Sequence, residues 1–197
     1  MLVAGAAFAL VPLLAPVGPP APVAASAAAT APAQTRSAPA ARAVSAGDDA
    51  DAPVPVELVL PDGTTSPIVP VGVAPDGQMA VPERVAEVGW YRFGPAPGAA
   101  GSSVLAGHVD DREQGLGAFA RLDELTAGGT VRVRRAGAPE QAWRIVEVRT
   151  VDKDQLDLPA LFDRAGPPRL TLVTCGGAFD RGWRQYEDNV VVTAVPR

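Results

Sequence analysis

Short apolar runs rich in β-branched residues, separated by turns of glycine and proline, fill this chain from about residue 54 to its C-terminus. Such runs, bounded by Pro-Asp-Gly and similar turn sequences, are typical of β-strands. About eight short strands with little helix predict an all-β barrel or sandwich. Single helical turns are expected at residues 83–88 and 158–162, and nothing in the pattern suggests βαβ units.

The segment before the strands divides into two parts of different composition. Residues 1–18 are almost wholly apolar, and no Lys or Arg occurs before Arg36. A transmembrane helix needs roughly 20 residues, so this run is closer in length to the core of a signal peptide. Ala25-Ser26-Ala27 offers a small-residue cleavage site downstream. We therefore expect residues 1–18 to be an export signal or a membrane anchor.

Residues 19–53 are rich in alanine and proline and show no periodicity. A segment of this composition buries too little apolar surface to offset the entropy lost on ordering, so we expect a disordered, semi-extended linker. The folded domain is then residues 54–197. A net charge of −5 without any cluster of Lys or Arg argues against nucleic acid as a partner.

Two residue types that carry chemistry each occur once in the chain. Cys175 follows the apolar run 170–174 and precedes two glycines, and His108 follows the apolar run 103–107. We expect the strand at residues 170–174 to end at Cys175, where a sharp turn would leave the thiol exposed. One cysteine cannot form an internal disulfide, and a lone thiol in an exported protein indicates possible reactivity.

A thiol and an imidazole brought together could act as a nucleophile and a general acid–base. A free thiol has a pKa of about 8.5, and a neighbouring imidazole can take its proton or stabilise the thiolate. The same imidazole can then protonate a leaving amine. The two residues are far apart in sequence, so only a fold that places both strand ends together would form the pair. The alternative is a small buried cysteine and a turn histidine with no chemical role.

The surrounding sequence resembles a known family. Residues 104–108 (Val-Leu-Ala-Gly-His) resemble the strand-plus-histidine motif of sortases, and residues 171–175 (Thr-Leu-Val-Thr-Cys) match their Thr-Leu-x-Thr-Cys signature. Further stretches are similar to actinobacterial class F sortases, namely residues 70–77, 89–91, 107–110, 175–181 and 188–192.

The resemblance implies a closed β-barrel of about eight strands with short helices, held at the outer face of the membrane by its N-terminus. It implies a cysteine transpeptidase of the peptidase class that cleaves a Leu-Pro-x-Thr-Gly-like sorting signal on secreted proteins. By this analogy Cys175 forms a thioacyl intermediate. His108 protonates the leaving amine and then deprotonates an acceptor amine, which comes from a cell-wall precursor or another protein.

Sortases also use an arginine after the cysteine to steady the substrate and its oxyanion. In many of them this arginine directly precedes the last apolar strand, where this chain has Asn189. The resemblance leaves Arg181 and Arg184 as the candidates, and we favour Arg181 because it lies within the block Cys-Gly-Gly-x-Phe-Asp-Arg. Either could equally be a solvated surface arginine.

Four more residues are candidates for contact with the substrate: Thr174, Gly176, Trp183 and Tyr186. Thr174 could add a hydroxyl or backbone N–H near the oxyanion, and Gly176 would allow close approach of a ligand. Asp110 is a candidate for orienting His108, as carboxylates do in catalytic triads. No cofactor is expected, and no zinc site, because the chain has one histidine and one cysteine as soft ligands.

Two other functions fit parts of the sequence. A secreted β-barrel that binds a partner or has a structural role would carry the same strands, with Cys175 buried and inert. A cell-wall L,D-transpeptidase would also use a cysteine, but these enzymes usually carry His and Gly close before it, where this chain has Leu172-Val173-Thr174. The motifs therefore favour a transpeptidase of the sortase kind.

Overall fold

The computed structural model describes residues 52–182 and 185–197. The predicted anchor, residues 1–18, and nearly all of the predicted linker, residues 19–53, lie outside the described residues. Within the described part, no helix combines the length and the apolar character needed to span a membrane.

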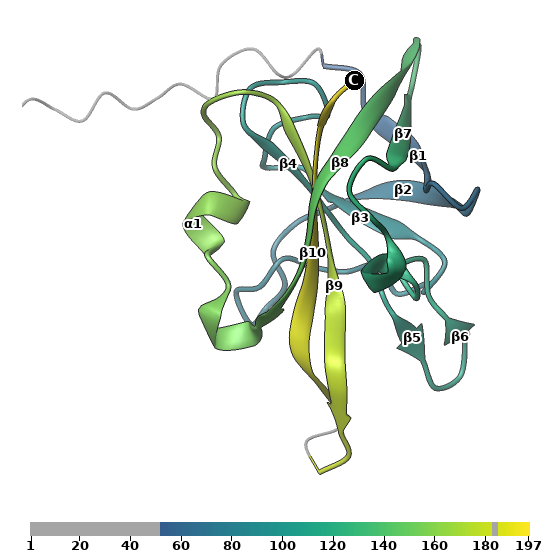
Figure 1. The fold of residues 1–197 in the computed structure, drawn as a ribbon, viewed down its shortest axis with the longest axis vertical. Coiled ribbons are helices and arrows are strands. Elements are labelled where there is room, and N and C mark those ends of the chain that lie inside the picture. Colours follow the sequence, from purple (N-terminus) through teal and green to yellow (C-terminus); the bar gives the residue numbers. More distant parts are fainter. Residues whose placement is uncertain (1–51, 183–184) are drawn as a thin grey trace, which may run out of the picture. The chain divides into compact units, whose positions relative to one another are not determined.

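Across these described residues, eight strands close into a barrel in the order β1-β2-β3-β4-β9-β10-β8-β7 (Figure 1). Their bounds are β1 Pro55–Val59, β2 Thr65–Val71, β3 Val88–Tyr91, β4 Ser102–Ala106, β7 Thr130–Arg135, β8 Ala138–Asp152, β9 Arg169–Asp180 and β10 Gln185–Pro196. A two-stranded sheet is formed by β5 (Asp110–Asp111) and β6 (Gly115–Leu116). The closed barrel confirms the all-β prediction and the barrel of about eight strands that the resemblance implied, and it excludes the sandwich that the strand pattern alone left open.

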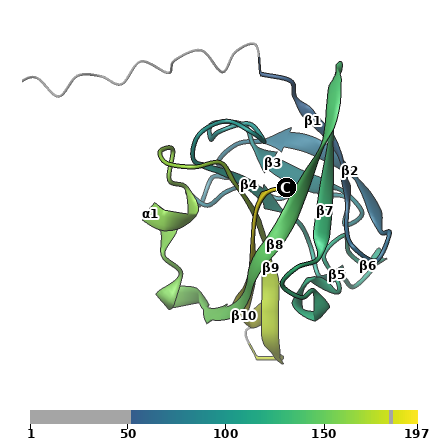
Figure 2. The ribbon, with the colours of Figure 1, turned by 45° about the horizontal axis from the view of Figure 1, so that its top comes forward.

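Helix is confined to single turns among the described residues: η2 (Leu122–Glu124), η3 (Lys153–Gln155) and α1 (Leu158–Leu161). The α1 turn confirms the short helix predicted at 158–162. Asp157 caps it, because its carboxylate accepts a hydrogen bond of 3.0 Å from the backbone N–H of Ala160. In Figure 2, α1 lies beside the β4 side of the barrel, away from β5 and β6.

The barrel contains two parallel pairs, β2 with β3 and β4 with β9. β2 pairs with β1 through residues 65–67 and with β3 through residues 68–71, so each part of β2 has a partner on one side only. This half-paired arrangement accommodates Pro67 and Pro70, which lack the N–H that a fully paired strand would need.

The core fills the barrel with side chains from alternate strand positions. Leu105 of β4, Leu172 of β9 and Val192 of β10 are register partners across three adjacent strands, and each is 0% exposed. Trp143 and Phe119 are the two largest side chains that are fully buried among the described residues. The strands that carry residues 108 and 175 are therefore fixed by the best-buried layer of the barrel.

The prediction that a strand ends at Cys175 is wrong, because β9 continues to Asp180. Antiparallel pairing with β10 continues beyond the cysteine, with Asp188 opposite Gly176 and Gln185 opposite Asp180. The pairing shifts register in this region, and Gly177 has a φ of 76°. The two glycines therefore accommodate a bulge in a long hairpin, where a chain reversal was expected.

The predicted helical turn at residues 83–88 is also wrong. Residues 83–86 form bends and a turn, and β3 begins at Val88. Tertiary contacts compete with a helix here: the backbone N–H of Val85 donates to the side chain of Gln114, and its carbonyl accepts from Ala118.

Replacing Leu172 by alanine would remove the central side chain of the layer shared by β4, β9 and β10. We expect the free energy of unfolding to fall by about 2–5 kcal/mol, because a cavity is left in a closed barrel. Urea unfolding followed by tryptophan fluorescence would measure it. The matched control is Leu116→Ala, at a side chain that is 77% exposed, where we expect a change within about 0.5 kcal/mol. Equal losses in the two variants would contradict this description of the core.

Candidate active site

The parallel pairing of β4 with β9 sets the relative height of His108 and Cys175. The ladder joins Ser102 to Arg169 and continues to Ala106 and Val173. Each residue of this ladder has its partner 67 positions later, the same separation that joins Gly107 to Thr174 by a hydrogen bond. His108 and Cys175 have this separation too, so they occupy equivalent positions just beyond the paired part of the two strands.

Two hydrogen bonds hold the strands together up to this point. The backbone N–H of Gly107 donates to the carbonyl of Val173 at 3.2 Å, and the hydroxyl of Thr174 donates to the carbonyl of Gly107 at 2.8 Å. Thr174 is 4% exposed. Its hydroxyl is therefore engaged in joining β9 to β4, which is a different role from the oxyanion contact predicted for it.

The ring of His108 is oriented by a backbone carbonyl. Its Nε2 lies 2.8 Å from the carbonyl oxygen of Pro82, 26 positions earlier. A carbonyl oxygen only accepts, so Nε2 carries the proton in this contact and Nδ1 is the nitrogen left to exchange protons. The His108 backbone is also fixed, because its carbonyl accepts from Phe119 and any Cβ at Gly117 would collide with it. The histidine is half-buried.

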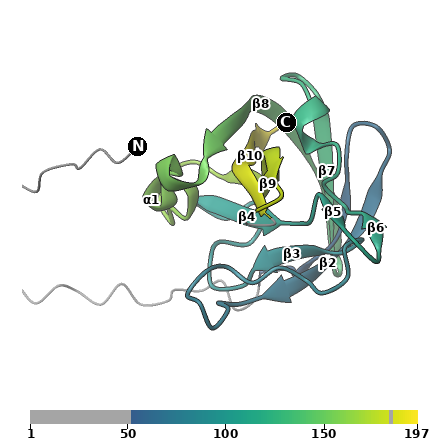
Figure 3. The same ribbon diagram turned by 90° about the horizontal axis from the view of Figure 1, so that it is seen from below.

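Cys175 is a free and exposed thiol. On its other side, Asn189 of β10 is its register partner. Side chains directly opposite each other on antiparallel strands share a face, with Cβ atoms about 4.5–5.5 Å apart. On the β4 side of β9, His108 is thus at the same height as Cys175 along the strands, and on the β10 side Asn189 is directly opposite Cys175. Figure 3 views this end of the barrel, where β9 and β10 lie beside β4.

The two glycines after the cysteine pack against β10. A Cβ on Gly176 would lie 2.5 Å from a methyl group of Val190, and a Cβ on Gly177 would collide with the carboxyl of Asp188. Gly176 is buried. Its lack of a side chain therefore serves the packing of β9 on β10, whereas the sequence suggested room for a ligand.

Tyr186 connects the β9–β10 hairpin to the segment after His108. Its hydroxyl donates to Asp110 at 2.8 Å, and its ring packs edge-on against Phe179 at a centroid distance of 5.2 Å. The bond to Asp110, partial burial, and the negative charges of Asp110 and Cys175 raise the pKa of Tyr186 above its usual value. Asp110 therefore bonds to Tyr186, whereas the sequence suggested that it would orient His108.

Of the two predicted arginines, Arg181 is described, and it lies well beyond Cys175 along β9. Arg181 is exposed in the turn after β9. Six residues of extended strand cover about 20 Å, so its backbone is far from Cys175. Arg184 and Trp183 lie outside the described residues. Figure 1 shows the β9–β10 hairpin projecting beyond the neighbouring strands at this end.

A pair of carboxyl groups lies next to the bulge of β9. Asp188 is opposite Asp152 of β8 and packs against Gly177. Loss of solvent around Asp188, together with its hydrogen bond to Asp152 and the charge of that group, raises the pKa of Asp188, while Lys153 opposes the shift. The side chain of Gln155 donates to the Asp152 carboxylate at 2.7 Å.

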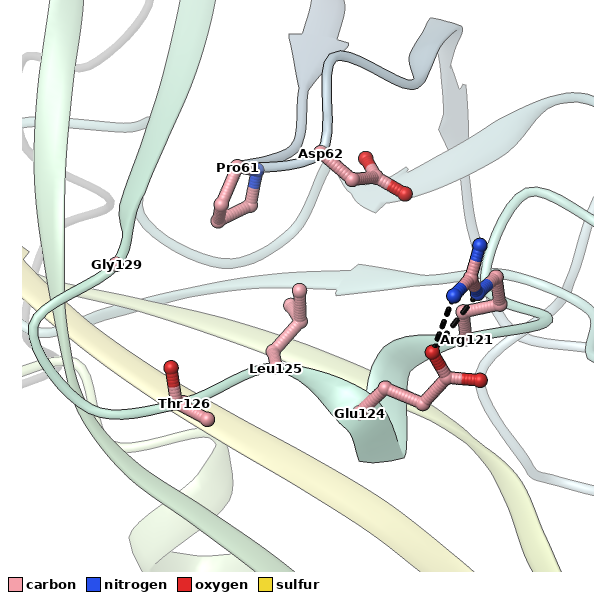
Figure 4. A pocket seen from close by; sticks show the side chains of 7 residues that line it. All are labelled: Pro61, Asp62, Arg121, Glu124, Leu125, Thr126 and Gly129. Atoms are coloured by element: carbon pink, nitrogen blue, oxygen red, sulfur yellow. Dashed lines mark hydrogen bonds and ion pairs between the residues drawn. The ribbon is translucent and has the colours of Figure 1, made fainter.

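No cluster of three or more His, Cys, Asp or Glu side chains within residues 52–182 and 185–197 could hold a metal ion. A pocket of about 320 Å³ lies among the β1–β2 turn, η2 and the residue before β7 (Figure 4), lined by Pro61, Asp62, Arg121, Glu124, Leu125, Thr126 and Gly129. Neither His108 nor Cys175 lines it, so this pocket is separate from the candidate site.

Sequence reasoning missed Pro82 and Gln114 as part of the histidine's surroundings. Pro82 acts through its backbone carbonyl, which every residue has, so its identity carries no signal. Gln114 acts on a backbone segment about 30 positions away in sequence, and its type alone does not reveal that contact.

Replacing Asp152 by asparagine should stabilise the protein near neutral pH. Asp188 has a folded-state pKa above its ordinary 3.8, so its contribution to stability is greatest below pH 3.8 and is lost as the pH rises through the raised value. Removing the charge of Asp152 reduces the loss of stability caused by ionised Asp188. Asparagine at position 152 keeps a side-chain oxygen that can accept the hydrogen bond from Gln155. Thermal unfolding should show a higher Tm near pH 7, and a difference that shrinks below pH 3.8. The control Asp154→Asn removes the same charge from the same turn, and an equal gain there would refute the pairing.

A comparison with known families matches a sortase domain to residues 62–197, more than half of the chain. No curated protein sequence matches the chain. Solved structures with the same fold include Streptococcus agalactiae sortase C1, with 21% identity over 72% of this chain and 66% of that one, and a TM-score of 0.56. Actinomyces oris sortase C-1 has 20% identity over 72% and 73% of the two chains, with a TM-score of 0.55.

A Clostridium perfringens sortase D5 transpeptidase has 18% identity over 74% of this chain and 79% of that one, with a TM-score of 0.54. This chain spans just under two thirds of the length of the Streptococcus agalactiae protein. The classes named in these three structures are C and D, so the likeness to class F rests on the sequence motifs alone. The domain match and the closed barrel together show that this chain belongs to the sortase family.

Proposed function

We propose that this chain is a membrane-associated cysteine transpeptidase, of the class F kind, that cleaves a Leu-Pro-x-Thr-Gly-like sorting signal and transfers the acyl group to an amine. The observation that carries the proposal is the β4–β9 register, which brings His108 level with an exposed, free Cys175. Membership of the sortase family supports the same chemistry.

In the proposed first step, His108 takes the proton of the Cys175 thiol, and the sulfur attacks the carbonyl carbon before the scissile bond. The tetrahedral intermediate collapses with cleavage of the C–N bond, and His108 gives a proton to the leaving amine. The product of this step is a thioacyl enzyme. An incoming amine then gives up a proton to His108 and attacks the thioester carbon, which forms a new amide and returns the thiol. Water in place of the amine gives slow hydrolysis.

The proposed substrates are secreted proteins with a C-terminal sorting signal, and the proposed acceptor is an amine of a cell-wall precursor or another protein. An enzyme that handles such substrates works outside the cytoplasm, and the apolar residues 1–18 would keep it at the membrane. No nucleic acid takes part in this proposal.

For the oxyanion we propose Asn189 as a donor, with Arg181 and Arg184 as the alternatives that the family resemblance suggests. Asn189 is the cross-strand partner of Cys175, and an asparagine amide is a known type of oxyanion donor. Arg181 would need the β9–β10 hairpin to fold over the bound peptide, because it follows the far end of β9.

The proposal as a whole is tested with the full-length chain, a Leu-Pro-x-Thr-Gly peptide library and an amine acceptor. We expect a peptide thioester on Cys175 by intact-mass spectrometry and a ligated product. Cys175→Ala should abolish both, and His108→Ala should lower the rate by about 10²–10⁴-fold, the usual contribution of a general acid–base. The exposed-site variant Leu116→Ala should keep the parent rate.

An unreactive Cys175 would support the alternative function, a secreted β-barrel that binds a partner or has a structural role. If neither the peptides nor a small thiol reagent modify Cys175 in the folded chain, the proposed transpeptidase function is rejected. Modification by the thiol reagent with no peptide adduct would show a reactive thiol that acts on other substrates, and would reject the proposed sorting signal.

A separate comparison of Asn189→Ala with Arg181→Ala and Arg184→Ala distinguishes the oxyanion donors. Loss of one such donor lowers kcat by about 10²–10³-fold, and we expect this loss for Asn189→Ala, with a small change in KM. Asn189→Asp, which keeps the size but removes the amide, should lose as much. If an arginine variant loses activity on this scale while Asn189→Ala does not, the oxyanion role passes to that arginine.

A further inference from the structure

The carbonyl that orients His108 belongs to a segment without helix or strand. Pro82 is buried, and residues 83–86 after it form bends and a turn. The backbone groups of such a segment have no ladder or helix to bind them, so they need partners elsewhere. The position of the Pro82 carbonyl therefore depends on whatever holds this segment.

One side chain satisfies two of those backbone groups. The amide of Gln114 donates through Nε2 to the carbonyl of Glu83 at 2.9 Å and accepts through Oε1 from the N–H of Val85 at 3.2 Å. An amide is suited to this because it offers a donor and an acceptor side by side. Val85 is also anchored from the other side, since its carbonyl accepts from Ala118 at 2.7 Å and its side chain is 5% exposed.

Gln114 is an exposed residue whose backbone is anchored. Its backbone N–H, like that of Glu113, donates to the carboxylate of Asp111 at 2.9 Å. These bonds lower the pKa of Asp111, and the charge of His108 acts in the same direction. Asp111 follows His108 by three residues, so the segment that carries Gln114 is the one that begins at His108. Gln114 in turn bonds to Glu83, and Pro82, the residue before Glu83, bonds to the ring of His108.

We propose that Gln114 is a positioning residue that holds the Pro82 carbonyl against Nε2 of His108, and so fixes the ring orientation and leaves Nδ1 as the nitrogen that exchanges protons. Gln114 does not touch the reacting atoms and acts through two backbone bonds. Its role in catalysis rests on the function proposed above for His108, whereas its effect on the ring is a property of the folded chain.

The chain has one histidine, so ¹⁵N-histidine labelling gives the ring signals of His108 alone. In the full-length protein with the ring in its neutral form, we expect an Nε2–H tautomer whose proton is protected from exchange with water. In Gln114→Leu that proton should exchange about tenfold faster, because an ordinary hydrogen bond is worth about this factor. Gln114 also lines a pocket of about 400 Å³, which leaves room for leucine.

Two further variants make the test specific. Gln114→Glu keeps the acceptor for Val85 and loses the donor to Glu83, so its exchange rate should fall between those of the parent and Gln114→Leu. Gln78→Leu makes the same replacement at an exposed residue of the β2–β3 connection and should leave the signal unchanged. With the peptide substrate, Gln114→Leu should lower kcat about tenfold at an unchanged KM, since positioning of the acid–base is lost.

The outcomes separate this inference from the proposed function. An Nδ1–H tautomer in the parent protein, or a protected Nε2–H that survives in both Gln114 variants, overturns the role of Gln114. A protected Nε2–H that Gln114→Leu exposes supports that role even if the chain shows no transpeptidation, and in that case the proposed function alone fails. An unchanged kcat in an active Gln114→Leu enzyme would refute a role in catalysis.

Discussion

The structure depends above all on the parallel pairing of β4 with β9. Strand ends that are 67 positions apart in sequence meet because five consecutive residue pairs fix the register. Leu105 and Leu172 within this ladder are fully buried, so a slip of one residue would expose core side chains. The relative position of the His108 imidazole and the Cys175 thiol is therefore stabilised by the apolar core, which lies away from both groups.

Close packing of backbones reinforces this arrangement around the site. Gly107 lies against Phe119, Gly117 against the His108 carbonyl, and Gly176 against Val190, each without room for a Cβ. The thiol stays exposed, whereas the backbone that carries it is enclosed on both sides by β4 and β10. The support beneath the exposed thiol is therefore rigid, and it holds the sulfur in a fixed position at the surface of the barrel.

Hydrogen bonds from loops complete the surroundings of the histidine. The carbonyl of Pro82 contacts the ring of His108, and Gln114 holds the segment that carries Pro82. Tyr186 joins Asp110, two residues after His108, to the β9–β10 hairpin. On the opposite side of the thiol lies Asn189, with no described arginine as its neighbour in register.

The sequence by itself determined the all-β fold class, most strand positions, and the two residues whose chemistry stands out, because alternation, turn residues and unique side chains are local signals. The strand pattern alone left barrel and sandwich open, and the closed barrel was implied only by the family resemblance. Only the tertiary structure decided that β9 passes through Cys175 and that residues 83–86 remain a turn. It also decided the neighbours of the site, such as Asn189 and the Pro82 carbonyl. These depend on strand register and on backbone groups that every residue possesses, and no local pattern encodes them.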